Sequence, residues 1–104
     1  MILITVEDLK TALSDKSKVA QFVDVRTPAE FAKSRIDGFV SIPLGSPAEA
    51  WTKLDKKAPV YVICLSGGRS QQACGELEAM GYKDVRNVQG GMLAWRAKKF
   101  PEVR

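Results

Sequence analysis

The chain has 104 residues, with 16 Lys plus Arg, 12 Asp plus Glu, two cysteines and no histidine. Without histidine it can form no Ser-His-Asp triad, Cys-His pair or imidazole base, and two cysteines cannot supply a Cys₄ or Cys₂His₂ zinc site. The length allows one domain, and the net charge of +4 is spread without a basic stripe, which argues against nucleic-acid binding.

The start of the chain predicts a helix followed by a strand. Residues Met1–Val6 are apolar but too few for a signal peptide or a membrane span, so we expect a cytoplasmic protein. Thr5, followed three residues later by Asp8, forms a weak capping box and predicts a helix over 6–14. The β-branched run Val19–Val25 predicts a strand.

Two stronger helix starts come next. Thr27–Glu30 and Ser46–Glu49 each combine a hydroxyl, a proline and a glutamate with the spacing of a capping box. They predict helices over 28–34 and 47–54, and the short β-branched run Phe39–Ile42 predicts a strand between them.

The second half of the chain continues the alternation. Val60–Cys64 is apolar almost throughout, as expected for a strand that is covered on both faces. A glycine-rich turn leads into a predicted helix over 69–80, which Gly81 can close. A strand at Asp84–Val88 and a helix over 92–99 follow. The alternation predicts one α/β domain with a parallel sheet between helices.

Cys64 ends the most apolar predicted strand, where ligands gather in an open parallel sheet. A cysteine in such a strand is usually inert, but the turn that follows points to a reactive thiol. Backbone amides of a glycine-rich turn and a helix start favour an anion, so they would lower the pKa of the thiol. The turn consists of Leu65, Ser66, Gly67, Gly68, Arg69 and Ser70, and the arginine adds a fixed positive charge.

These motifs together resemble the rhodanese-like sulfurtransferase domains. C-L-S-G-G-R-S at 64–70 is similar to the family's active-site loop C-x-S-G-x-R-S. Asp24–Phe31 resembles its D-V-R-x-x-x-E-[FY] segment, and Ile42–Leu44 resembles the I-P-L that follows. Residues 81–95 are similar to the closing pattern G-Y…N-V-x-G-G-x-x-A-W. The matches occur in the family's order from about residue 20 to 96.

The resemblance implies a single rhodanese-like domain over 1–104, with a three-layer α/β/α fold and a five-stranded, mostly parallel sheet. It implies that Cys64 takes a sulfane sulfur from thiosulfate or a persulfide donor, becomes a persulfide and passes the sulfur to cyanide, a small thiol or a protein thiol. The amides of Leu65 through Ser70 would surround the outer sulfur, and Arg69 would either hold an anionic donor or brace the loop. No cofactor, metal, nucleic acid or membrane partner is expected.

Asp24, Arg26 and Glu30 are expected to support the loop rather than to contact substrate. Asp24 lies at the end of the predicted strand and can accept hydrogen bonds from loop amides. Arg26 can pair with Glu30 and so fix the next helix.

Cys74 shares a predicted helix face with Leu77 and Met80, so we expect it to be buried. Helical rise places it well beyond the loop, and a disulfide with Cys64 would be strained. Trp95, with its neighbours Ala94 and Leu93, predicts an apolar helix face in the core.

One residue departs from the family pattern. Members commonly have a histidine where this chain has Arg35, which leaves the choice of acceptor open while the cysteine chemistry does not depend on it.

Two other classes of protein share parts of this pattern. Phosphatases and arsenate reductases related to the Cdc25 fold use C-x₅-R, whereas only four residues separate Cys64 from Arg69 here. A shorter ring of amides suits one terminal sulfur better than a tetrahedral oxyanion. Non-catalytic rhodanese-like modules, which serve binding or regulation, typically lack the cysteine. The sequence favours the sulfurtransferase over both.

Overall fold

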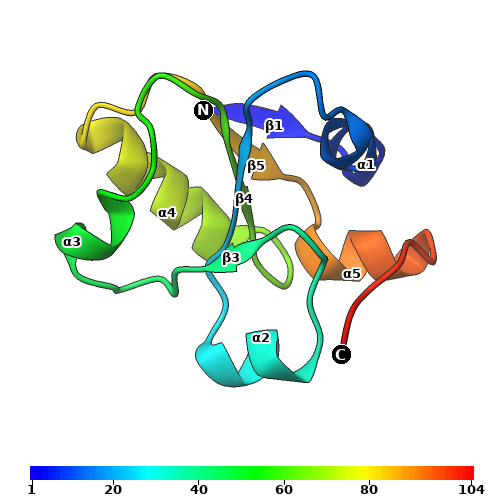
Figure 1. Ribbon diagram of the computed structural model, residues 1–104. Coiled ribbons are helices and arrows are strands. Elements are labelled where there is room, and N and C mark those ends of the chain that lie inside the picture. The colour runs from blue at the N-terminus through cyan, green and yellow to red at the C-terminus, as the bar shows by residue number, and fades with distance from the viewer.

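A five-stranded parallel sheet runs through the computed structural model, which describes residues 1–104 (Figure 1). The strand order is β1-β5-β4-β2-β3, so β4 lies at the centre of the sheet. All four strand pairs are parallel, which confirms the predicted α/β fold. The strands are β1 (Ile2–Ile4), β2 (Gln21–Asp24), β3 (Val40–Ser41), β4 (Val60–Ile63) and β5 (Val85–Val88).

Four helices connect the strands and a fifth follows β5, and none is long and apolar enough to cross a membrane. The capping boxes predicted at Thr5 and Thr27 are both formed, with each hydroxyl accepting from the amide three residues later. The helices are α1 (Val6–Ser14), α2 (Pro28–Lys33), α3 (Ala48–Trp51), α4 (Gly68–Ala79) and α5 (Gly91–Ala97).

The capping box predicted at Ser46 is wrong. Helix α3 covers only four residues and has Pro47 at its N-cap, without a side-chain hydrogen bond. The Ser46 hydroxyl instead donates to the carbonyl of Pro43 at 2.6 Å, because the turn before the helix brings that oxygen within reach. The local sequence favours a cap, but the turn supplies a competing acceptor.

The edge strands are shorter or less visible in the sequence than the central ones. β1 was not predicted as a strand, since its three residues are too few to show a pattern; it forms by pairing Ile2–Ile4 with Arg86–Val88. β3 pairs only two residues with β2. Val19, predicted in a strand, is 76% exposed and precedes the start of β2.

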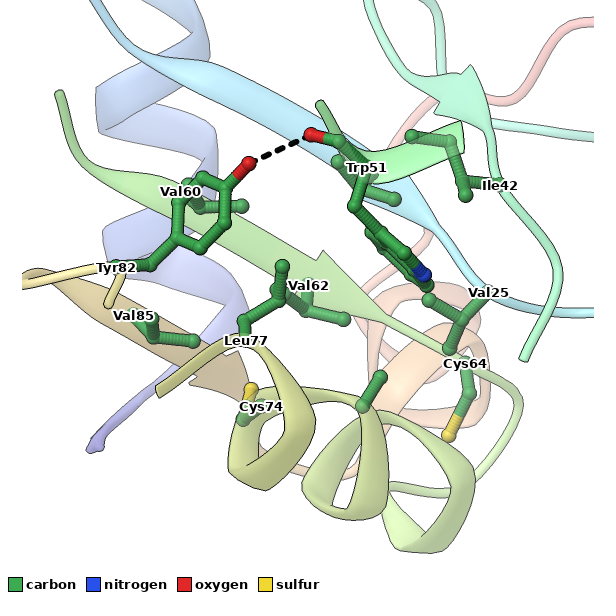
Figure 2. Close-up of a cluster of buried hydrophobic side chains, with 12 residues drawn as sticks. Val25, Ile42, Trp51, Val60, Val62, Cys64, Cys74, Leu77, Tyr82 and Val85 are labelled. Atoms are coloured by element: carbon green, nitrogen blue, oxygen red, sulfur yellow. Dashed lines mark hydrogen bonds between the residues drawn. The ribbon is translucent and has the colours of Figure 1, made fainter. Parts of the chain in front are cut away.

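Two apolar clusters lie on opposite faces of the sheet. Val60 and Val62 of β4 point into the cluster beneath α3 and α4, whereas Tyr61 and Ile63 point into the cluster beneath α1 and α5. In the first cluster the Tyr82 hydroxyl donates to the Trp51 carbonyl at 2.6 Å (Figure 2). This alternation makes three layers and buries both faces of β4.

Helix α5 is packed only partly as predicted. Trp95 is buried in the second cluster and Ala94 packs against it, but Leu93 is 52% exposed. Leu93 lies in the first turn of a helix that rests on the sheet by another face, so its side chain points outward.

The first turn of α5 is bound to the backbone at the end of β4. The amides of Met92 and Leu93 donate to the carbonyls of Cys64 and Leu65 at 2.9 and 3.0 Å. Gly91 has a φ of +55°, and a Cβ there would overlap the Cys64 carbonyl oxygen and lie 2.7 Å from that of Leu65. Only glycine allows this contact between the two segments.

We expect Gly91→Ala to lower the free energy of unfolding by about 2–4 kcal/mol, because the new methyl group meets rigid backbone at a positive φ. Gly75→Ala is the matched control: Gly75 lies inside α4, and a Cβ there meets nothing within 4 Å. That variant should gain about 0.5–1 kcal/mol from helix propensity. Urea unfolding measures both, and equal stabilities would contradict the proposed clash.

Candidate active site

Cys64 is the first residue after β4 and is 1% exposed, so its thiol lies at the floor of the loop that follows. The amide of Gly67 donates to Cys64 Sγ at 3.0 Å, and the Ser70 hydroxyl lies 3.3 Å from the same sulfur. Gly67 has a φ of +117°, which turns the chain back toward the sulfur before α4 begins at Gly68. The structure thus brings the thiol, the turn and the helix start together.

The surroundings of Cys64 favour its thiolate. Burial raises the pKa of the Cys64 thiol, but hydrogen bonds from the Ser70 hydroxyl and from the backbone at Ser70, Gly67 and Ser66 outweigh it and lower the pKa. A lower pKa gives more of the nucleophilic thiolate near neutral pH. The donors are one hydroxyl and the main chain, so no imidazole is needed.

Asn87 of β5 orients the Ser70 hydroxyl, a role that the sequence analysis missed. Its Oδ1 accepts from Ser70 Oγ at 2.5 Å, while Ser70 Oγ also lies 3.0 Å from the carbonyl of Gly67. A hydroxyl has one proton, so Ser70 can accept from the Cys64 thiol while it donates to Asn87, or turn its proton toward the thiolate. Asn87 is buried, and its place in the N-V-x-G-G pattern shared with the family was the available signal.

Arg69 joins the loop to helix α2. Its two terminal nitrogens donate to the two carboxylate oxygens of Glu30 at 2.7 and 3.1 Å. Glu30 also accepts from the amide of Thr27 and so completes the capping box of α2. One carboxylate therefore stabilises both the helix and the loop, and this geometry favours the bracing role for Arg69.

The predicted pair between Arg26 and Glu30 is wrong. Arg26 binds the carboxylate of Asp24 through Nε and Nη2, at 2.8 to 3.0 Å, and donates from Nη2 to the Ser34 carbonyl at 2.7 Å. Both members of this pair are at least 98% buried, where a charge needs its partner close by. Asp24 also accepts from the loop amide of Arg26, as expected.

Cys74 lies in α4 and faces the first apolar cluster (Figure 2). Burial raises the pKa of its thiol to about 12, with Glu78 adding to the rise. Both cysteines are free. The expected burial is confirmed, and the raised pKa disfavours the thiolate of Cys74 at neutral pH.

Arg35, at the family's histidine position, makes no hydrogen bond to Cys64 or its loop. Its backbone pairs with Val103 in the C-terminal segment, and its guanidinium lies over the ring of Phe31. Nowhere do three Cys, Asp or Glu side chains come together in a group that could hold a metal ion.

The site of this α/β domain is thus a thiol of lowered pKa at the carboxyl end of the central strand, enclosed by a turn that opens a helix. A family model described as the rhodanese-like domain matches residues 5–98, nearly the whole chain. The chain therefore belongs to the rhodanese-like domain family, as its motifs predicted.

Several relatives are similar over most of their length. A sulfurtransferase of Allochromatium vinosum is 37% identical over 93% of this chain and 90% of its own. The thiosulfate sulfurtransferase GlpE of Pseudomonas putida is 38% identical over 79% of this chain and 74% of its own. The crystal structure of a rhodanese-like domain protein from Staphylococcus aureus is 39% identical, with a TM-score of 0.83 over 91% of each chain.

We expect Ser70→Ala to raise the pKa of Cys64, because it removes the strongest of the hydrogen bonds that lower it. The pH dependence of alkylation by iodoacetamide measures this pKa, and in the native protein its midpoint should lie below the ordinary thiol value of about 8.5. Ser66→Ala, which removes an exposed hydroxyl from the same loop, should leave the midpoint unchanged. Equal midpoints for both variants would contradict the assigned role of Ser70.

The Glu30–Arg69 pair predicts a loss of stability in acid. Arg69 is the main cause that lowers the pKa of Glu30 from 4.5 to about 2, so the pair stabilises the fold above pH 4.5 and fails as the pH falls toward 2. Glu30→Gln should cost about 0.5–1 kcal/mol at neutral pH, since both groups are about one-third exposed, and nothing near pH 2. Urea unfolding at both pH values measures this, with Glu49→Gln as an exposed control; a cost independent of pH would contradict it.

Proposed function

We propose that this chain is a rhodanese-type sulfurtransferase in which Cys64 carries a sulfane sulfur from a donor to a thiophilic acceptor. The observation that carries the proposal is the thiol of Cys64, hydrogen-bonded by the Gly67 amide and beside the Ser70 hydroxyl at the floor of the loop. The names of the A. vinosum and P. putida relatives agree with it.

In the first step the Cys64 thiolate attacks the sulfane sulfur of thiosulfate. A bond forms between the two sulfurs, the S–S bond of thiosulfate breaks, and sulfite leaves with the electron pair. Two negative charges enter with thiosulfate and two leave with sulfite, so the persulfide keeps the single charge of the thiolate. No proton moves, and the step therefore requires no general base.

In the second step a thiophilic acceptor attacks the outer sulfur of the persulfide. With cyanide, a carbon–sulfur bond forms, the S–S bond breaks and thiocyanate leaves while Cys64 returns to its thiolate. With a thiol, the acceptor attacks as its thiolate: a new S–S bond forms to the outer sulfur, the S–S bond to Cys64 breaks, and the product leaves as an ionised persulfide while Cys64 returns to its thiolate. The same amide and hydroxyl that favour the starting thiolate favour it again as the leaving group.

Loop length and the cysteine itself argue against the alternatives. The loop from Cys64 to Arg69 is one residue shorter than that of the related phosphatases and arsenate reductases, and Arg69 is engaged by Glu30 rather than free for an oxyanion. A module that serves only for binding has no need for a thiol whose pKa is lowered. Phosphatase activity on an aryl phosphate that Cys64→Ala abolishes would favour the first alternative.

Incubation with thiosulfate should add one sulfur atom to the native protein, and cyanide should remove it with formation of thiocyanate. Intact mass spectrometry before and after each reagent measures both steps. Cys74→Ser is the matched control and should still gain the sulfur, because Cys74 is buried with a raised pKa. Sulfur that still adds to Cys64→Ser, or none on the native chain, would refute the proposal.

A further inference from the structure

A polar pocket of about 330 Å³ lies beside the active-site loop. Its walls come from the start and end of α2, from Leu65 of the loop, and from α5 and the C-terminal segment, which runs back toward α2 (Figure 1). Its volume is at the lower end of those that bind small molecules. We call it the Arg26 pocket, and its lining includes Arg26, Lys33, Leu65, Arg96, Glu102 and Arg104.

Arg26 presents an unused hydrogen-bond donor to this pocket. Its Nε and Nη2 are engaged by Asp24 and the Ser34 carbonyl, whereas Nη1 donates to no protein atom. The residue is 2% exposed, and no fully buried side-chain nitrogen lacks a partner, so the unbonded Nη1 keeps some accessible surface. Because Arg26 lines the pocket, we assign that surface to the pocket. A buried guanidinium fixed on one side and open on the other is a ready site for an anionic oxygen.

The other charges around the pocket reinforce this preference. The two carboxylates of the lining are already engaged, Glu30 by Arg69 and Glu102 by Arg96. Lys33 and Arg104 line the pocket and form no ion pair. The uncompensated charge that faces the pocket is therefore positive.

We propose that the Arg26 pocket binds the carboxylate of the acceptor, so that this sulfurtransferase prefers small thiols that carry a carboxylate. The inference rests on the proposed function, because the pocket adjoins the active-site loop: Leu65, which lines it, directly follows Cys64, and Glu30, which also lines it, is bound by Arg69 of the loop. A donor such as thiosulfate does not fit this role: its sulfonate is bonded directly to the sulfur that Cys64 attacks and must stay at the loop. An anion in the pocket has to be several bonds from its sulfur.

Binding can be tested without sulfur transfer. Cys64→Ala protein labelled with ¹⁵N is titrated with 3-(methylthio)propionate, which has the carboxylate but no free thiol, and with the neutral 2-(methylthio)ethanol. We expect saturable NMR shifts at the amides around Lys33, Leu65 and Arg96 with the carboxylate only. Equal shifts with both compounds, or none at these amides, would overturn the proposal.

Kinetics then test the preference. Arg26 also holds the buried Asp24, so we change the exposed Lys33 instead. Lys33→Gln should raise the KM for 3-mercaptopropionate about fivefold, but leave those for 2-mercaptoethanol and thiosulfate within about twofold. Lys83→Gln, an exposed lysine between α4 and β5, is the matched control and should change none of them.

The two proposals fail in different ways. If thiosulfate adds no sulfur to Cys64, the proposed function fails, while the NMR titration still reports on the pocket. If Cys64 is loaded normally but Lys33→Gln treats 3-mercaptopropionate and 2-mercaptoethanol alike, the carboxylate preference is wrong and the sulfurtransferase stands.

Discussion

The contact between the first turn of α5 and the end of β4 constrains the whole active site. The amides of Met92 and Leu93 donate hydrogen bonds to the carbonyls of Cys64 and Leu65, and Gly91 allows the two backbones to approach closely. Because those carbonyls point toward α5, the chain beyond Leu65 turns the other way, and the Gly67 amide faces the Cys64 sulfur. Gly90 and Gly91, which in the sequence only precede a predicted helix, thus help to orient the active-site loop, which is distant from them in the chain.

The site stabilises a negative charge with groups that do not themselves titrate near neutral pH. Main-chain amides and the Ser70 hydroxyl favour the Cys64 thiolate, and Asn87 orients that hydroxyl from the neighbouring strand. The two charged pairs serve as supports: Asp24–Arg26 is buried beneath α2, and Glu30–Arg69 joins α2 to the loop. Sulfur transfer needs a good nucleophile and leaving group more than a proton carrier, so the missing histidine limits the chemistry without preventing it.

The sequence predicts most of the features that depend on neighbouring residues, with the cap at Ser46 as an exception. Thr27 and Glu30 form their capping box, the apolar run of β4 is buried on both faces, and Cys64 lies at the carboxyl end of that strand. Features that depend on distant partners were missed or wrong. Arg26 pairs with Asp24 rather than with Glu30, and Glu30 is instead held by Arg69, which lies two strands further along the chain, in α4. β1 exists only through its pairing with β5, and the Arg26 pocket requires the C-terminal segment to return to α2.

The central claim is that an amide-stabilised thiolate takes up sulfur without the help of a side-chain base. The most direct test is the rate of a single turnover of Cys64 with thiosulfate, followed across the pH range. The account predicts a single ionisation whose midpoint equals the pKa of the Cys64 thiol and lies below the ordinary value of about 8.5. A bell-shaped profile, a second ionisation or a midpoint at the ordinary thiol value would contradict it.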